Sequence, residues 1–88
     1  MTRKKNLLDF PCEFPIKAFG YSGDAFEADV VTIVRKHVKD IPEGAFKLTP
    51  SKAGTYTSIT ITITATSQEQ LDAIYIDLTK SPHVIMAL

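Results

Sequence analysis

The sequence predicts an α+β protein whose strands and helices follow one another in the order β-α-β-β-α-β. Three observations support this prediction. Within the stretch 56–66, residues 58–66 alternate between serine or threonine and isoleucine or alanine, which is the strongest strand signal that a single sequence gives. Residues 24–40 and 66–81 instead repeat apolar side chains at helical spacing. Glycine or proline stands at most of the junctions between these segments, where the chain must turn.

The first half of the chain is expected to form a strand and then a helix. Alternation of apolar side chains predicts the strand from Phe14 to Gly20, and Gly20-Tyr-Ser-Gly23 supplies turn chemistry. Ser22 or Asp24 is expected to cap the helix, which should end near Asp40. The apolar stripe of this helix comprises Phe26, Val30, Ile33, Val34 and His37.

The second half adds a short strand, the long alternating strand, a helix and a final strand. The short strand is expected from Ala45 to Thr49 and the final one over residues 83–88. Thr66 and Glu69 fit a capping box between the long strand and the second helix. In that motif the Thr66 hydroxyl accepts from the backbone amide of Glu69, and the Glu69 carboxylate accepts from the backbone amide of Thr66. Ser81-Pro82 should end this helix.

Two β-α-β halves with right-handed crossovers give a four-stranded antiparallel sheet with both helices on one face, the ferredoxin-like topology. The first and third strands are expected at its centre, and Pro50 suits an edge because it cannot donate a ladder hydrogen bond. The helix-covered face is expected to carry Ile16, Ile59, Ile61, Ile63, Val84 and Met86. The open face is expected to carry Lys17, Phe19, Lys47, Ser58, Thr60, Thr62, Thr64, Ile85 and Ala87.

Composition and charge narrow the classes of function. The 88 residues suffice for one domain, expected over residues 7–88 after a flexible basic tail at residues 1–6. The formal net charge of zero argues against nucleic acid and against an anionic membrane as partners. Cys12 is the only cysteine, and a lone thiol fits a reducing cytoplasm. Since no apolar run approaches the length of a membrane-spanning helix, a soluble cytoplasmic protein is expected.

The sequence offers no catalytic, cofactor or metal centre, so a protein without enzymatic activity is expected. His37 and His83 lie far apart in the sequence, and a single cysteine adds no second soft ligand. His37 belongs to an apolar helical stripe and is expected to be a structural, hydrogen-bonded histidine. Cys12 stands beside Glu13 and lacks a neighbouring cation that would favour the thiolate.

A first candidate site is the turn formed by Gly20, Ser22, Gly23 and Asp24. Free amides at a helix N-terminus attract anions, so a small carboxylate or amino-acid ligand is one interpretation. A turn followed by a helix cap explains the same four residues, and the carboxylate of Asp24 opposes an anion.

The open sheet face is the second candidate site, with Lys17, Phe19, Thr60, Thr62 and Ile85 as its candidate residues. An aromatic side chain in a polar, β-branched surround resembles an interface anchor, so an unidentified protein partner or a second copy could bind there. A solvated sheet face is the alternative interpretation. RNA binding is a minor alternative, because the aromatic and basic motif of RNA-recognition modules is missing.

Several segments of the chain resemble the YbeD family of small bacterial cytoplasmic proteins. These segments are Leu7–Pro11, Phe14–Gly20, Thr49–Tyr56, Ser58–Thr66 and Val84–Leu88. The resemblance implies a ferredoxin-like sheet similar to that of ACT regulatory domains, which bind small ligands, often amino acids, at subunit interfaces. It implies no established activity and no agreed site residues. The expected function is therefore a regulatory or protein-interaction module, and the alternative is an ACT-like sensor of a small metabolite.

Overall fold

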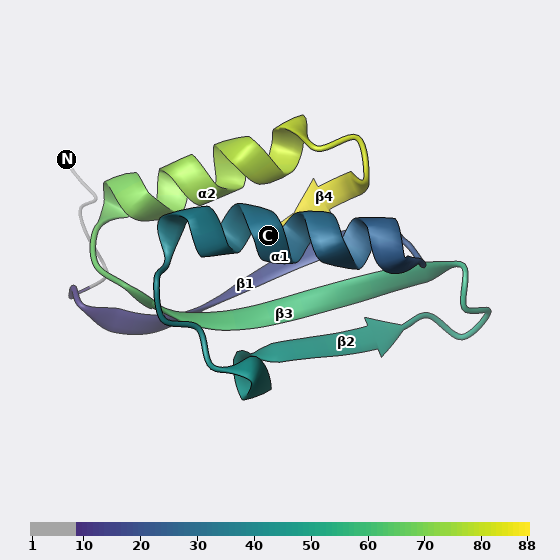
Figure 1. Ribbon diagram of the computed structural model, residues 1–88, viewed down its shortest axis with the longest axis horizontal. Coiled ribbons are helices and arrows are strands. Elements are labelled where there is room, and N and C mark those ends of the chain that lie inside the picture. Colours follow the sequence, from purple (N-terminus) through teal and green to yellow (C-terminus); the bar gives the residue numbers. More distant parts are fainter. Residues whose placement is uncertain (1–8) are drawn as a thin grey trace, which may run out of the picture.

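The computed structural model describes residues 9–88, so the basic tail expected at residues 1–6 lies outside the described part. The elements follow in the predicted order (Figure 1). They are β1 (Cys12–Tyr21), α1 (Asp24–His37), the short 3-10 helix η1 (Glu43–Ala45), β2 (Phe46–Pro50), β3 (Tyr56–Ala65), α2 (Gln68–Lys80) and β4 (Val84–Ala87). This order confirms the ferredoxin-like α+β prediction. Neither helix within residues 9–88 is long and apolar enough to cross a membrane.

The four strands form one antiparallel sheet in the order β2-β3-β1-β4. The first and third strands are therefore central, as predicted, and β2 and β4 are the edges. Both helices lie on the same side of this sheet (Figure 1). Within residues 9–88 no helix lies on the opposite side of the sheet, which we call the open face.

Alternation along β3 divides its side chains between the core and the open face. The residues of β3 that are buried are Thr57, Ile59, Ile61, Ile63 and Ala65. Ile16 and Ala18 of β1 are buried on the same side, because Ile16 pairs with Ile61 and Ala18 pairs with Ile59. The helices complete the core with Phe26, Val30, Ile33 and Val34 of α1 and Leu71, Ile74 and Leu78 of α2.

The pairing of β4 with β1 contains a β-bulge. Gly20 pairs with Val84, and its neighbour Phe19 pairs with Met86, so Ile85 is an extra residue on β4. An extra residue in one strand disturbs the alternation of side chains on that strand. The register of β4 therefore changes by one residue after the bulge.

The bulge corrects two sequence predictions about the faces of the sheet. Val84 and Ala87 pack against the core, whereas Ile85 and Met86 are exposed. The prediction that Met86 belongs to the helix-covered face and Ala87 to the open face is wrong. Both differences have the same cause, because the extra residue Ile85 breaks the strict alternation that the prediction requires.

The start of α1 also differs from the prediction. Its N-cap is Gly23, with φ of 146°, and no side chain caps the helix. The hydroxyl of Ser22 instead lies 2.7 Å from the hydroxyl of Thr57 on β3. Asp24 is the first helical residue, where a carboxylate is favoured by the positive end of the helix dipole. Neither of the two expected capping side chains therefore serves as the cap.

The cap of α2 lies one residue later than predicted. Ser67 is the N-cap, and its hydroxyl accepts from the Gln70 amide at 3.1 Å. The side-chain oxygen of Gln70 accepts from the Thr66 amide at 2.8 Å, so the predicted pair of Thr66 and Glu69 is wrong. The side-chain nitrogen of Gln70 donates to the His37 carbonyl oxygen at 3.0 Å. This hydrogen bond to the end of α1 favours Ser67 as the cap. With Ser67 as the cap, Gln70 is the third helical residue, whereas a cap at Thr66 would put Glu69 at that position.

The two prolines of the sheet lie where no neighbouring strand needs their missing donors. Lys17 and Leu88 exchange backbone hydrogen bonds of 2.9 and 2.7 Å, so alternate residues of β1, including Pro15, direct their backbone groups toward β4. The pairing with β4 does not extend to Pro15. On β2, Ser51 donates to Tyr56 of β3 at 2.8 Å, so the preceding Pro50 faces outward, as expected of an edge.

Candidate functional site

The open face of the sheet consists of transverse rows of side chains from neighbouring strands. Residues directly opposite each other in antiparallel strands share a face, so the register fixes the rows. In order along the face, the rows are Tyr21–Tyr56, Met86–Phe19–Ser58–Thr49, Lys17–Thr60–Lys47, Pro15–Thr62 and Glu13–Thr64. Leu88, which is exposed, extends the row of Lys17, because the two residues exchange backbone hydrogen bonds. The predicted residues Lys17, Phe19, Thr60 and Thr62 lie in these rows, and Ile85 lies in the bulge at the β4 edge.

Large apolar side chains gather at one end of the open face. Tyr21, Tyr56 and Met86 are 61%, 46% and 50% exposed, and Phe19 is half-buried in the row next to the two tyrosines. The rings of Tyr21 and Tyr56 stack with centroids 5.1 Å apart and planes inclined by 30°. We name Phe19, Tyr21, Tyr56 and Met86 the aromatic end of the face.

Two members of the aromatic end were missed by reasoning from the sequence. The turn chemistry of residues 20–23 predicts a turn at Tyr21, but β1 continues to Tyr21, which pairs with Tyr56. The period-two pattern of β1, extended by one residue beyond Gly20, places Tyr21 on the open face. Strict alternation along β4 predicts Met86 on the other face, and the bulge reverses this.

A hollow of about 240 Å³ lies beside the aromatic end, lined by Phe19, Thr49, Pro50, Ser51, Tyr56, Thr57 and Ser58. Ser58 is the smallest side chain in its row, and this leaves space between the larger groups. Its hydroxyl donates to the Thr49 carbonyl oxygen at 3.4 Å, and the Ser51 hydroxyl accepts from the Tyr56 amide at 3.2 Å. The surface that the hollow leaves for a ligand is mainly apolar and comes chiefly from the two rings and the proline.

The next row of the face contains two lysines. Lys17 and Lys47 are exposed and stand on either side of Thr60. Among the side chains that the structure describes, those of residues 9–42 and 44–88, the ion pairs join Asp77 to Lys36 and to His37, and neither lysine of the row has a carboxylate partner among them. The carboxylate within the rows is Glu13, two rows beyond the lysines. The face therefore combines apolar surface at one end with positive charge beside it.

The predicted ligand turn has a structural role at each position. Gly20 contacts Phe26 and the His83 carbonyl oxygen closely, Ser22 bonds to Thr57, and Gly23 adopts a positive φ. Asp24 begins α1 and lines a shallow hollow of about 420 Å³ on its outer side. Glu27 lines the same hollow, and two carboxylates disfavour an acidic ligand there. Binding of a small metabolite at this turn stays a prediction.

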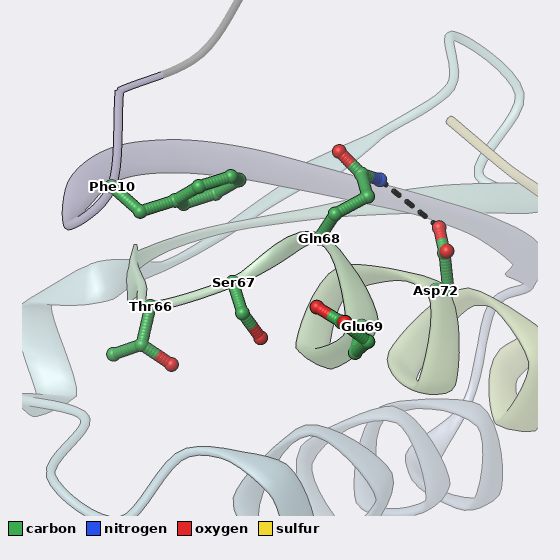
Figure 2. Close-up of a pocket in the computed structure, with 6 residues that line it drawn as sticks. All are labelled: Phe10, Thr66, Ser67, Gln68, Glu69 and Asp72. Atoms are coloured by element: carbon green, nitrogen blue, oxygen red, sulfur yellow. Dashed lines mark hydrogen bonds between the residues drawn. The ribbon is translucent and has the colours of Figure 1, made fainter. Parts of the chain in front are cut away.

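Another hollow, of about 420 Å³, lies at the start of α2 and is lined by Phe10, Thr66, Ser67, Gln68, Glu69 and Asp72 (Figure 2). The Gln68 amide group donates to the Asp72 carboxylate at 3.0 Å, and Ser67 caps the helix. Among the described side chains, those of residues 9–42 and 44–88, no group of three or more histidine, cysteine, aspartate or glutamate residues could hold a metal ion. The polar groups at this end of α2 are thus used mainly to begin the helix.

His37 is hydrogen-bonded, as expected for a structural histidine. Its Nε2 lies 2.7 Å from Oδ2 of Asp77, and this contact joins the end of α1 to α2. The hydrogen bond from His37 holds the pKa of Asp77 below its usual range, and the charge of Lys36 at 3.9 Å acts in the same direction. Elsewhere on α2, burial raises the pKa of Tyr75, whose hydroxyl donates to the Leu88 carbonyl oxygen at 2.7 Å.

The low pKa of Asp77 predicts that its contribution to stability depends on pH. A carboxyl whose pKa is lower in the folded state stabilises the fold above the pKa of the unfolded state. This contribution disappears as the pH falls through the lower, folded value. We expect wild type to exceed Asp77→Asn in free energy of unfolding at pH 5, and this difference to shrink by pH 3. Urea titrations of both proteins at the two pH values measure it, and an equal difference at pH 3 would contradict the assignment.

The comparisons with known proteins agree with the fold and identify bacterial relatives. The chain is 42% identical over 85 residues to a UPF0250 protein of Chromobacterium violaceum, with 97% of this chain and 96% of that protein covered. It is 43% identical over 84 residues to a UPF0250 protein of Paraburkholderia phytofirmans, with 96% and 94% covered.

A solved structure shares the architecture. The solution structure of protein HP0495 from H. pylori matches with a TM-score of 0.73 over 97% of this chain and 89% of that chain. At 17% sequence identity this likeness supports the fold alone. The family described as "Protein of unknown function (DUF493)" matches residues 5–88. With this match and relatives above 40% identity, the chain belongs to that family of small, YbeD-like bacterial proteins.

Proposed function

We propose that the protein is a non-enzymatic interaction module of the cytoplasm that binds a protein partner through the open face of its sheet. The observation that carries this proposal is the aromatic end, where Phe19, Tyr21, Tyr56 and Met86 converge on the side of the sheet that neither α1 nor α2 covers. Aromatic residues and methionine are enriched at protein interfaces relative to other surfaces. A contiguous exposed apolar patch on a small protein is typical of an interaction site.

The side chains of the open face favour binding over catalysis. The rows contain rings, hydroxyls, a thioether and lysines, whereas histidine and cysteine are missing from them. Glu13 lies at the opposite end of the face from the aromatic end, so no carboxylate of the rows adjoins the hollow. The free thiol of Cys12 is half-buried and packs against the core, which is compatible with a reducing compartment.

The size of the hollow favours a macromolecular partner over a metabolite. Sites that enclose a small molecule usually measure about 300–1,000 Å³ and cover most of its surface. The hollow of about 240 Å³ beside Phe19 is smaller and open to solvent, so it suits one side chain of a larger partner. This observation supports the interaction module over the ACT-like sensor at this face.

A pull-down from the source cell with paired variants tests the proposal. Phe19→Asp combined with Thr62→Lys places charges on the open face. Ile76→Asp combined with Thr79→Lys makes the same kinds of change at exposed positions of α2. We expect wild type and the α2 variant to capture the same protein and the open-face variant to lose it. Circular dichroism melts of both variants serve to check that each one folds. Equal capture by the two variants would contradict the proposal.

A further inference from the structure

We infer that the partner is a protein segment that inserts one large apolar side chain into the hollow and sets a carboxylate against the neighbouring lysine row. This inference rests on the proposed function, since it specifies the chemistry of a partner at the same face. It commits to an acidic and apolar peptide segment rather than to a second copy of the chain or to a nucleic acid.

The shape of the hollow specifies the apolar part of the segment. Phe19 and Tyr56 supply ring surface on the two central strands, and Pro50 supplies apolar surface on β2. The hydroxyls of Ser51 and Ser58 each hold one backbone hydrogen bond, and most of the surface that the lining leaves free is apolar, so an apolar group suits the hollow better than a polar one. A leucine, methionine or aromatic side chain fits this lining, and an anchor of this kind at the centre of a contact gives most of the binding energy.

The lysine row specifies the charge of the segment. Neighbouring rows are two residues apart along a strand, a distance of about 6.8 Å. Lys17 and Lys47 therefore begin one row from Phe19 and Ser58 and can reach a carboxylate adjacent to the anchor. Neither lysine has an ion-pair partner among the described side chains of residues 9–42 and 44–88, so an incoming carboxylate would break no ion pair within that set.

The same rows argue against a second copy as the occupant of the hollow. The carboxylate of the face is Glu13, which lies on the far side of the lysine row from the hollow. An arrangement of two copies that brings Lys17 of one near Glu13 of the other centres on Pro15, two rows from Phe19. Such a contact would complement the charges but would lie away from the hollow.

The number of charges argues against a nucleic acid. Affinity for a phosphate backbone grows with the number of phosphates neutralised, and specific complexes often use about 6–10 of these contacts. The rows of the open face supply Lys17 and Lys47, and the formal net charge of the chain is zero. Tyr21 and Tyr56 also stack on each other, so part of their ring surface is already in contact and is not free to stack on a base.

A displayed library of random nine-residue peptides tests the inference on the full chain. Selection on wild type is expected to enrich a large apolar residue accompanied by aspartate or glutamate. Selection on Lys17→Glu with Lys47→Glu is expected to replace the acidic residue by lysine or arginine. Lys39→Glu with Lys80→Glu carries the same change of charge at exposed positions away from the open face and should select as wild type does. Ser58→Phe fills the hollow and should abolish selection of the apolar anchor.

The affinity of one enriched acidic peptide is then compared between wild type, the Lys17 and Lys47 variant and the control pair. Fluorescence anisotropy is expected to show at least a tenfold loss on Lys17→Glu with Lys47→Glu and less than a twofold change on the control pair. Enrichment of basic peptides on wild type, indifference to charge, or no enrichment at all would overturn the inference. Saturable binding of a uridine oligonucleotide that needs Lys17 and Lys47 would also overturn it. If the library fails while pull-down still depends on Phe19, the proposed function stands and only the assigned partner chemistry is wrong.

Discussion

Replacement of Ile61 by aspartate is expected to unfold the protein at room temperature. Ile61 has 0% exposure at the middle of β3 and pairs with Ile16 on one side and Phe46 on the other. A carboxylate at this position would lose its hydration within an apolar core and find no cationic partner there. The cost of several kcal/mol approaches the whole stability of a typical small domain, about 5–15 kcal/mol.

The adjacent residue provides the matched control for this experiment. Thr62 is exposed on the open face, so Thr62→Asp should retain a cooperative unfolding transition close to that of wild type. Far-UV circular dichroism and urea titration compare the three proteins. A near-wild-type transition for Ile61→Asp would show that the two faces of β3 have been exchanged.

Gly20→Ala is expected to destabilise the fold by about 1–3 kcal/mol, the usual cost of overfilling a packed site. A Cβ at Gly20 would lie 2.5 Å from Cδ1 of Phe26 and would overlap the backbone carbonyl oxygen of His83. Phe26 is buried, and the carbonyl belongs to the segment that leads into β4, so neither group can move freely. The substitution should therefore disturb the entry into β4 as well as the core.

Gly44→Ala is the control for the glycine substitution. A Cβ at Gly44 has no neighbouring heavy atom within 4 Å, and the residue lies in η1 without a positive φ. Its free energy of unfolding should stay within about 0.5 kcal/mol of wild type, as for most surface substitutions. Urea titrations of both variants measure the contrast. Equal stabilities would mean that the space around Gly20 can relax.

The sequence was sufficient to predict the sheet because its strongest patterns agree with the tertiary arrangement. The alternation of β3 places Ile59, Ile61 and Ile63 against the helices, as the structure shows. The order of elements and the right-handed crossovers then leave little choice of topology. Pro50 correctly indicated an edge, because the constraint it imposes is local and acts on its own strand.

The errors arose where a distant residue decides between two locally similar choices. The bulge at Ile85 accompanies the close approach of Gly20 on β1 to His83, which no pattern within β4 reveals. The cap of α2 involved two overlapping motifs of equal local quality, and Ser67 serves as the cap in the fold. Tyr21 joined the open face because β3 begins at Tyr56 and pairs with it. The aromatic end of the face could therefore be predicted only in part.

Site-specific photocrosslinking measures most directly whether a partner occupies the open face. A benzophenone amino acid in place of Met86 would stand in the row of Phe19 without lining the hollow, and one in place of Ile76 would stand on the exposed side of α2. Illumination in the source cell is expected to give a discrete protein adduct from position 86, lost when Phe19→Asp is added, and none from position 76. An adduct from position 76 without one from position 86 would contradict binding at the open face.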